Sequence, residues 1–144
     1  MKSIDNNAPV KCHKTITINA KREIVWKLIT DINEWPSWQT DISKSAFSGE
    51  LKPETPFRWK SGGATIQSIL HTVVPFHQFG WTGSTFGIRA IHNWQLEELN
   101  NQTILKVEES MNGLLARIFR KFFNKTLERG MVKWLALLKL ESER

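Results

Sequence analysis

The stretch GIRAIHNWQLEELNNQTILKVEESMNGLLARIFRKFFNKTLERGMVKWLALL, residues 87–138, decides the fold because its hydrophobic period changes once. Residues 87–99 and 102–111 alternate between apolar and polar side chains, which predicts two β-strands. Asn100 and Asn101 lie between them, and Asn tolerates the positive φ of a two-residue hairpin turn. After Gly113 the apolar residues recur at helical spacing for about 25 residues, which predicts one long amphipathic helix from Leu114.

The hairpin also predicts which side chains share a face. With Asn100 and Asn101 as the turn, Leu99 pairs with Gln102 and every other pair follows from a constant residue sum. One face then carries Leu96 opposite Leu105, Trp94 opposite Val107, His92 opposite Glu109, and Ala90 opposite Met111. This face is apolar except for one pair, so we expect it to point inward. The other face is polar and is expected in solvent; it carries Arg89, Asn93, Gln95, Glu97, Lys106, Glu108 and Ser110.

The residues upstream of the hairpin add strands and two short helices. Alternation and breakers predict strands at residues 11–18, 42–48, 57–61, 64–74 and 77–82. A short amphipathic helix is expected over residues 20–30, with Asn19 as its N-cap, and a second helical turn starts near Pro36. Gly130, inside the long helix, indicates close packing against a strand or a local bend.

This order predicts an α+β domain that spans residues 1–144. A curved antiparallel sheet of about seven strands wraps on the long C-terminal helix, with two short helices after the first strand. A strongly curved sheet does not need to fill the space between itself and one helix. We therefore expect an internal cavity.

Composition excludes several classes of protein. The chain has 144 residues, 40% of them hydrophobic and 24% charged, with a net charge of +6, which is an ordinary globular composition. Cys12 is the only cysteine, so an intrachain disulfide is excluded and a cysteine-based zinc site is disfavoured. No His/Asp cluster, GxGxxG motif or P-loop is present, and we expect no metal and no cofactor. The first residues have no signal-peptide pattern and no apolar run is long enough for a membrane span, so a cytoplasmic location is expected.

Several short motifs carry a family likeness in their order and spacing. They are Ile18-Asn19-Ala20, Val25-Trp26, Trp35-Pro36 with Trp38, Gly49-Glu50-Leu51, Phe57-Arg58-Trp59, Phe79-Gly80-Trp81-Thr82-Gly83, His92-Asn93-Trp94, and residues 103–113 with Glu109 among them. In these the chain resembles the START/Bet v 1-like (SRPBCC) superfamily, in particular the bacterial polyketide cyclase/dehydrase-like proteins. The resemblance implies the helix-grip fold and a container for an apolar or amphipathic small molecule. Cyclases, dehydratases, lipid carriers and hormone binders are among such proteins, and no catalytic signature common to all of them is carried over.

His92 and Glu109 are the sharpest polar feature of the predicted inner face. A buried carboxylate is costly unless it is paired and hydrogen-bonded, and a neighbouring imidazole both stabilises it and can take part in proton transfer. One interpretation is a ligand-orienting or acid/base pair, and the alternative is a satisfied structural pair.

The aromatic residues supply the other candidates, since the chain has seven Trp, eight Phe and no Tyr. Alternation points Phe57 with Trp59, and Phe79 with Trp81, toward the interior, while Trp35, Pro36 and Trp38 are expected at the cavity mouth. The alternative for all of them is plain core packing. The full set of expected ligand-binding residues is Trp35, Trp38, Phe57, Trp59, Phe79, Trp81, His92, Trp94, Val107, Glu109, Met111, Phe122 and Met131.

Three functions follow from these patterns. The leading one is a non-catalytic carrier of a small hydrophobic or amphipathic molecule. The second is a cyclase or dehydratase in which His92 and Glu109 form the acid/base pair. The third is an interaction module that meets an anionic membrane or another partner through the basic helix face, which carries Arg117, Arg120, Lys121, Lys125, Lys133 and Lys139. Nucleic-acid binding is not expected, because the aromatic residues follow core periodicity.

Overall fold

A computed structural model describes all 144 residues and has the expected α+β architecture. Seven antiparallel strands form one sheet in the order β1-β7-β6-β5-β4-β3-β2. The strands are β1 (Val10–Ile18), β2 (Ile42–Phe47), β3 (Pro56–Ser61), β4 (Ala64–Val74), β5 (Gln78–Thr85), β6 (Ile88–Leu99) and β7 (Gln102–Asn112). The helices are α1 (Arg22–Thr30), the single 3₁₀ turn η1 (Ile32–Glu34), α2 (Trp35–Trp38), α3 (Leu114–Ile118) and α4 (Arg120–Ser142).

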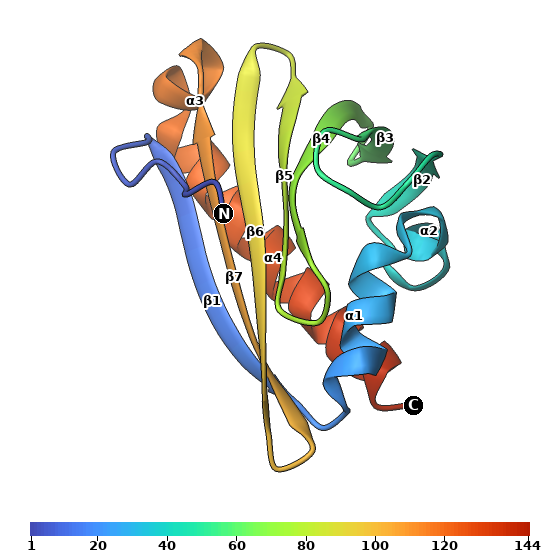
Figure 1. Cartoon of the computed structure of the whole chain (residues 1–144). Coiled ribbons are helices and arrows are strands. Elements are labelled where there is room, and N and C mark those ends of the chain that lie inside the picture. The colour runs from blue at the N-terminus through green and yellow to red at the C-terminus, as the bar shows by residue number, and fades with distance from the viewer.

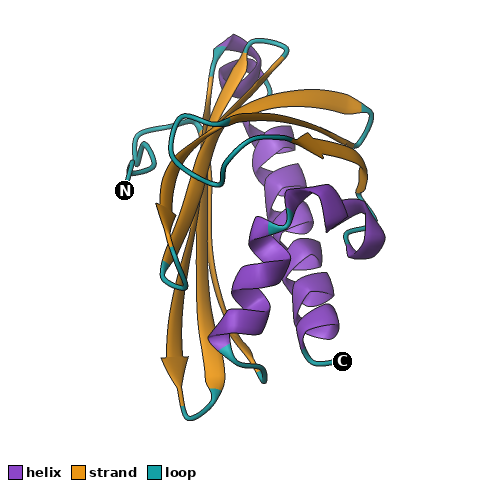
Figure 2. Ribbon diagram, turned by 45° about the vertical axis from the view of Figure 1, so that its right-hand side comes forward, coloured by secondary structure: helices purple, strands orange, loops and turns teal.

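The sheet curves around α4, which lies across its concave face (Figure 1). Figure 2 shows the second layer, where α1 and α2 cover the remainder of that face beside α4. The apolar faces of these helices and the inner face of the sheet form one buried cluster, because each element can hide its apolar side only against the others. None of the helices combines the length and the apolar character that a membrane span needs.

The hairpin of β6 and β7 has the predicted register. Leu99 pairs with Gln102, His92 with Glu109, and Ala90 with Met111. Asn100 and Asn101 have φ of 53° and 62°, the left-handed conformation that a two-residue hairpin turn requires.

The C-terminal helix differs from the prediction, because it is broken at Phe119. Phe119 has φ −106° and ψ 39°, which are not helical values, so α3 ends there and α4 begins as a separate helix. The break allows α3 to bury Ala116 against the sheet while α4 crosses the concave face. Both pieces keep the same apolar period, so the sequence pattern alone does not show where they separate.

One local prediction about helices is wrong, and one of the two alternatives given for Gly130 is excluded. Asn19 does not cap α1, which begins at Arg22 after Lys21 and has no side-chain cap. A Cβ built on Gly130 meets no atom within 4 Å, so this glycine does not mark a close approach of α4 to a strand.

The polar outer face of the hairpin is not fully in solvent, which corrects a further expectation. The first eight residues fold back over it and bury Ile4 and Ala8. Asn93 donates from Nδ2 to the Lys2 carbonyl at 2.8 Å, and the Asp5 amide donates to Ser110 Oγ at 3.0 Å. Asn93 and Ser110 are consequently about 1% exposed.

Candidate functional site

The site is a cavity of about 740 Å³ between the concave face of the sheet and the first half of α4. Its floor comes from alternate residues of β3 to β7, which face inward because strand side chains alternate. Its other wall is the α4 segment before Leu135. The apolar lining consists of Trp59, Ile66, Trp81, Ile88, Ala90, Met111, Phe123, Leu127, Met131 and Trp134.

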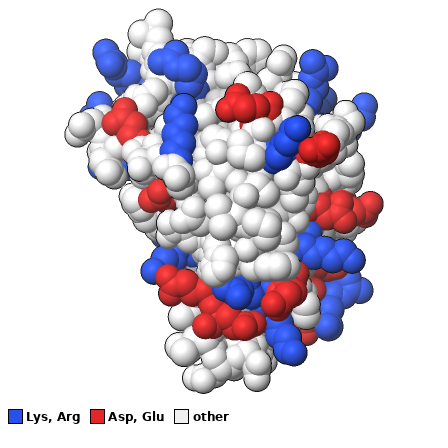
Figure 3. Space-filling view, in the orientation of Figure 1, with Lys and Arg blue, Asp and Glu red and all other residues white.

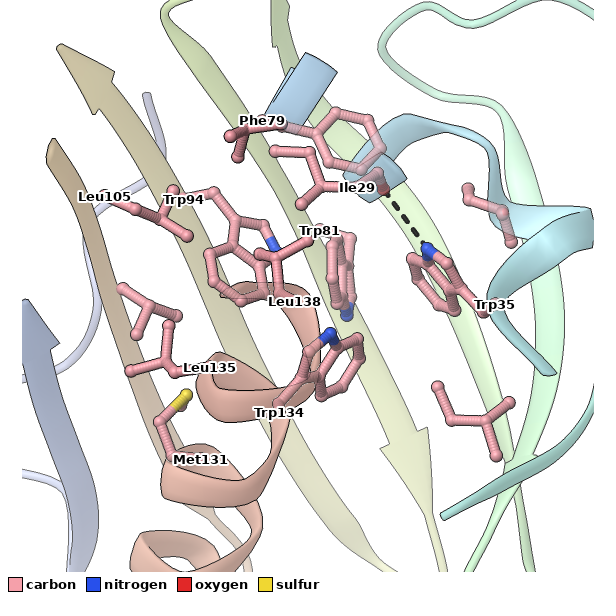
Figure 4. Packing of buried hydrophobic residues seen from close by; sticks show 14 of the residues in the cluster. Ile29, Trp35, Phe79, Trp81, Trp94, Leu105, Met131, Trp134, Leu135 and Leu138 are labelled. Carbon is pink, nitrogen blue, oxygen red and sulfur yellow. Dashed lines mark hydrogen bonds between the residues drawn. The ribbon is translucent and has the colours of Figure 1, made fainter. Parts of the chain in front are cut away.

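Beyond Trp134 the interior is solid, and Trp35 lies at its centre. Trp35 is fully buried, and its ring centroid lies 5.4–5.9 Å from those of four other aromatic residues: Phe57, Trp59, Trp81 and Trp134. Its Nε1 donates to the Ile29 carbonyl at 3.3 Å, shown as the dashed line in Figure 4. Edge-to-face contacts of this kind favour dense aromatic packing, so the rings close this end of the cavity.

His92 and Glu109 lie side by side on the cavity floor, as the register predicts. His92 Nδ1 and Glu109 Oε1 are 2.5 Å apart. This hydrogen bond joins the imidazole to the carboxyl group across the β6–β7 pair and fixes the two side chains relative to each other. The His92 side chain is 2% exposed and that of Glu109 is 14% exposed, so Glu109 is the member of the pair that a ligand meets directly.

Trp81 fixes the orientation of the His92 ring. The two rings stack with centroids 4.3 Å apart and planes 11° apart, because Trp81 and His92 are cross-strand partners on β5 and β6. The rings of Trp94 and Trp134 pack against the same imidazole, with centroids 4.9 and 5.8 Å from its centroid. Packing from several sides holds the imidazole behind the carboxylate.

Three buried ring nitrogens near this floor have no hydrogen-bond partner. They are His92 Nε2, Trp94 Nε1 and Trp134 Nε1. A buried polar atom without a partner costs free energy. All three nitrogens are sealed inside the packed interior, so they lower the stability of the fold and are not contact points for a ligand.

Exposed residues form the rim of the cavity, at the loop after α2, the turn between β3 and β4, and the outer side of α4. Lys133 on α4 reaches across this rim to Asp41, with Nζ and Oδ1 2.6 Å apart. Both side chains are more than a third exposed, so this ion pair is weak and can open.

The structure divides the predicted ligand-binding residues into three groups. Trp59, Trp81, His92, Glu109, Met111 and Met131 line the cavity. The buried core, away from the cavity, contains Trp35, Trp38, Phe57, Phe79, Trp94 and Val107. Phe122 is 63% exposed and points outward.

Two of these placements correct predictions. Trp35 and Trp38 do not lie at the cavity mouth, because α2 turns both indoles inward and leaves Pro36 outside. Phe122 does not line the cavity, because the break at Phe119 makes Phe123 the phenyl ring on the inner side.

Sequence reasoning missed other lining residues, including Ile66 and Leu127. A signal for Ile66 was present, since it lies between polar neighbours on β4 and pairs with Trp59. Leu127 belongs to the apolar stripe of the helix, and its position along the helix decides whether it meets the cavity or the core.

The remaining reactive groups do not form a second centre. No three His, Cys, Asp or Glu side chains are placed to hold a metal ion. Cys12 is buried on β1, and burial raises the pKa of its thiol, which keeps the thiol protonated and weakly nucleophilic.

Comparison with known proteins gives one family and a set of shared folds. The family model for polyketide cyclase/dehydrase and lipid transport matches residues 9–143. No curated protein matches the chain. A hypothetical protein from Helicobacter pylori superposes with a TM-score of 0.85 at 16% identity, covering 99% of this chain and 97% of that one.

Two further solved structures are similar at the same level. A START superfamily protein from Mycobacterium smegmatis has a TM-score of 0.81 at 14% identity, with 92% of this chain and 97% of that chain covered. The Zhui aromatase/cyclase from a Streptomyces species has a TM-score of 0.81 at 16% identity, with 93% of each chain covered. At these identities the likeness shows the helix-grip fold alone.

Proposed function

The chain belongs to the polyketide cyclase/dehydrase and lipid transport family, and from this membership we propose that it binds a small amphipathic molecule in the cavity beside α4. The cavity's volume of about 740 Å³ supports this, since small-molecule sites are of this size. The single observation that carries the proposal is the carboxylate of Glu109 on the cavity floor, next to apolar lining residues and away from the Asp41–Lys133 ion pair at the rim. The ligand therefore has an apolar body and one hydrogen-bond donor.

Glu109 is the proposed anchor for that donor. Its carboxylate lines the cavity and is held by His92, which leaves its other lone pairs free to accept a hydrogen from a ligand hydroxyl. A hydrogen bond to a charged group is stronger than one between neutral groups. Trp59, Trp81 and Met131 supply the apolar contacts for the body of the ligand.

A matched pair of ligands tests this proposal. β-Naphthol and naphthalene have the same ring system and differ in one hydroxyl. We expect β-naphthol to bind the wild type about tenfold more tightly, because the hydroxyl donates to the Glu109 carboxylate. Titration calorimetry measures both affinities, and the shift in thermal midpoint with ligand concentration checks them independently.

Variants separate the anchor from the cavity. Glu109→Gln should reduce the preference for β-naphthol, and Glu109→Leu should abolish it while naphthalene still binds. Glu97→Gln, on the exposed outer face of β6, is the matched control and should leave both affinities unchanged.

Two results would contradict these expectations. Equal affinities of the wild type for the two ligands would reject Glu109 as the anchor. Absence of binding by either one, together with no small molecule in mass spectra of the protein purified under native conditions, would reject the cavity as a binding site.

Proton transfer on the bound molecule is the second candidate function, and the His92–Glu109 hydrogen bond favours it. In a cyclase or dehydratase, Glu109 would exchange a proton with the substrate and His92 would hold or share that proton. The discriminating experiment incubates the co-purified molecule with wild type and with Glu109→Gln. Loss of water from the molecule only with the wild type, while both proteins bind it, would establish catalysis. An unchanged molecule in both would leave the carrier function alone.

A further inference from the structure

One end of the molecule exposes an unusual number of large apolar side chains. We call this surface the apolar tip; it consists of Phe86, Leu114, Leu115, Ile118, Phe119 and Phe122. Phe86 is 76% exposed, Leu114 is 70% exposed and Phe122 is 63% exposed. Single exposed apolar residues are normal on a protein surface, but a contiguous group of this size marks an interaction site.

The apolar tip is one surface although it comes from separate elements. Phe86 lies in the turn between β5 and β6, and the other residues belong to α3, to its junction with α4, and to the first turn of α4. The turn rests against the start of α3, since a Cβ built on Gly113 would overlap the carbonyl oxygen of Gly87. Figures 1 and 2 both place α3 beside this turn at the upper end of the molecule.

The helical segment that carries most of the apolar tip has charge of one sign. Residues 113–126 contain Arg117, Arg120, Lys121 and Lys125 and no acidic residue. All four cations are exposed, and none of them forms an ion pair within the chain. In Figure 3 the upper left of the molecule shows white atoms that protrude among several blue side chains, with a red group beside them. A basic, acid-free segment with exposed Phe and Leu is typical of a helix that lies in a membrane interface.

We propose that the apolar tip docks on the surface of an anionic lipid bilayer. The phenyl and aliphatic side chains enter the boundary between headgroups and acyl chains, and the four cations meet the lipid phosphates. Charge complementarity selects this partner over a second copy of the chain. A symmetric contact between two apolar tips would place the same cations against each other, and residues 113–126 offer no carboxylate to pair them.

The apolar tip adjoins the cavity through Phe123. This ring lines the cavity and lies 5.3 Å, between centroids, from the ring of Phe122. Docking does not depend on what the cavity holds, so it can be tested with the protein alone.

Flotation of the full-length protein with lipid vesicles tests the proposal. We expect the protein to float with vesicles of phosphatidylcholine and phosphatidylglycerol in equal amounts at low salt, and to stay behind with phosphatidylcholine alone. Raising the salt to about 0.5 M should release most of the bound protein, because it shortens the Debye length to a few ångströms.

Two pairs of variants resolve the contributions. Lys121→Gln with Lys125→Gln should weaken binding roughly 30-fold, since each cation near an anionic surface contributes about fivefold. Lys44→Gln with Lys60→Gln removes the same charge from exposed positions on β2 and β3 and should change little. Phe122→Ser should weaken binding at least about tenfold, whereas Leu140→Ser, at an exposed position near the other end of α4, should not.

Phe86→Ser tests whether the turn belongs to the same surface. It should weaken vesicle binding as Phe122→Ser does, although the two residues lie on different elements. All these side chains are exposed, and unchanged circular dichroism will show that the variants fold.

Several outcomes would overturn the proposal. One is the absence of flotation with anionic vesicles at low salt. Another is flotation that is equal for Phe122→Ser and the wild type. A concentration-dependent dimer in solution that Phe122→Ser dissociates, without any vesicle binding, would replace the bilayer by a second copy as the partner.

Discussion

Single residues decide how much of the interior is solid. Trp35 is 0% exposed and contacts aromatic rings from β3, β5 and α4, so it connects the three sides of the core. A smaller side chain at position 35 would leave empty space at the inner end of the cavity. The density of the core near Trp35 explains why the cavity is confined to the first half of α4.

Replacement of Trp35 by a smaller ring should therefore destabilise the protein. Trp35→Phe removes part of the ring and leaves the Ile29 carbonyl without its donor, so we expect unfolding free energy to fall by about 1–3 kcal/mol. Phe122→Ala, at an exposed position, should change it by less than about 0.5 kcal/mol. Urea denaturation measures both, and equal effects would refute the central role of Trp35.

His71 gives the protein a predicted sensitivity to acid. It is the extra residue of a bulge in β4 and lies on the outer face beside Asn93. Burial lowers the pKa of His71 from 6.5 to about 4, with smaller contributions in the same direction from Lys2 and the N-terminus. The neighbouring Asn93 opposes this shift, and His92 on the other face adds to it.

The folded chain therefore binds this proton less tightly than the unfolded chain does. With respect to His71, the unfolding free energy is highest above about pH 6.5, where the imidazole is neutral in both states. It falls progressively as the pH falls toward about 4, because the unfolded chain takes up the proton first. We expect the urea midpoint of the wild type to fall between about pH 7 and about pH 5, and His71→Gln to show a smaller fall. An equal fall in both proteins would mean that other groups cause the acid sensitivity.

The His92–Glu109 pair could be predicted from the sequence, and the position of Trp35 could not. A hairpin with a two-residue turn fixes its register by arithmetic, so the pair follows from the position of Asn100 and Asn101. Trp35 lies in a helix of four residues, which is too short for any period to indicate its inner face.

At the scale of elements, two glycines in the C-terminal region have opposite roles. Gly113 has φ +122° at the start of α3 and lies against the backbone of Gly87. Gly130 lies in the interior of α4 with open space beside it. Gly113 allows a close backbone contact that any residue with a Cβ atom would prevent. Gly130 makes no such contact and only increases the conformational entropy of the unfolded chain.

Alanine at these two positions should change stability in opposite directions. Gly113→Ala combines a disfavoured φ with a steric overlap and should cost about 2 kcal/mol or more. Gly130→Ala should stabilise the protein by about 0.5–1 kcal/mol, because alanine is the better helix former. Thermal midpoints of the two variants provide the measurement, and destabilisation by Gly130→Ala would show a packing role that the structure does not indicate.

Strands and the long helix were predictable as elements, while the break between α3 and α4 was not. All seven strands follow from alternation and breakers, and β4 has the predicted bounds of residues 64–74. The break at Phe119 depends on the tertiary contacts of α3 with β6 and β7, which the sequence pattern does not reveal. Helical periodicity is the same on both sides of it.

At the scale of the whole molecule, the first eight residues act as a cover for the outer face of the sheet. They bury Ile4 and Ala8, accept a hydrogen bond from Asn93 Nδ2 at the Lys2 carbonyl, and donate one from the Asp5 amide to Ser110 Oγ. Sequence periodicity does not reveal such a segment, because it contains no regular element and its hydrogen-bond partners on β6 and β7 are 91–107 residues away.

Removal of residues 1–7 should show what this cover contributes. We expect the loss of about 2–4 kcal/mol of unfolding free energy, because the buried Ile4 side chain and several hydrogen bonds are removed with the segment. The truncated protein should also lose part of its acid sensitivity, because His71 becomes more exposed. Ile4→Ser should reproduce part of the loss in urea denaturation and Leu140→Ser should not; an unchanged midpoint after truncation would contradict the prediction.

The existence of a cavity could be predicted from the architecture, but its extent could not. A curved sheet on one helix indicates enclosed space, and the inner-face residues of β3, β5, β6 and β7 identify part of its wall. Whether a given indole fills that space or borders it depends on packing in three dimensions, which is why Trp94 is core and Trp81 is wall.

The aromatic cluster also makes the protein its own optical reporter. Five indoles, of Trp35, Trp59, Trp81, Trp94 and Trp134, are connected by centroid distances of 5.4–6.4 Å, close enough for excited states to be shared among them. The chain has no tyrosine to contribute emission. A guest that touches Trp59, Trp81 or Trp134 should therefore alter the fluorescence of the coupled group, and occupancy could be followed by light without attaching a dye.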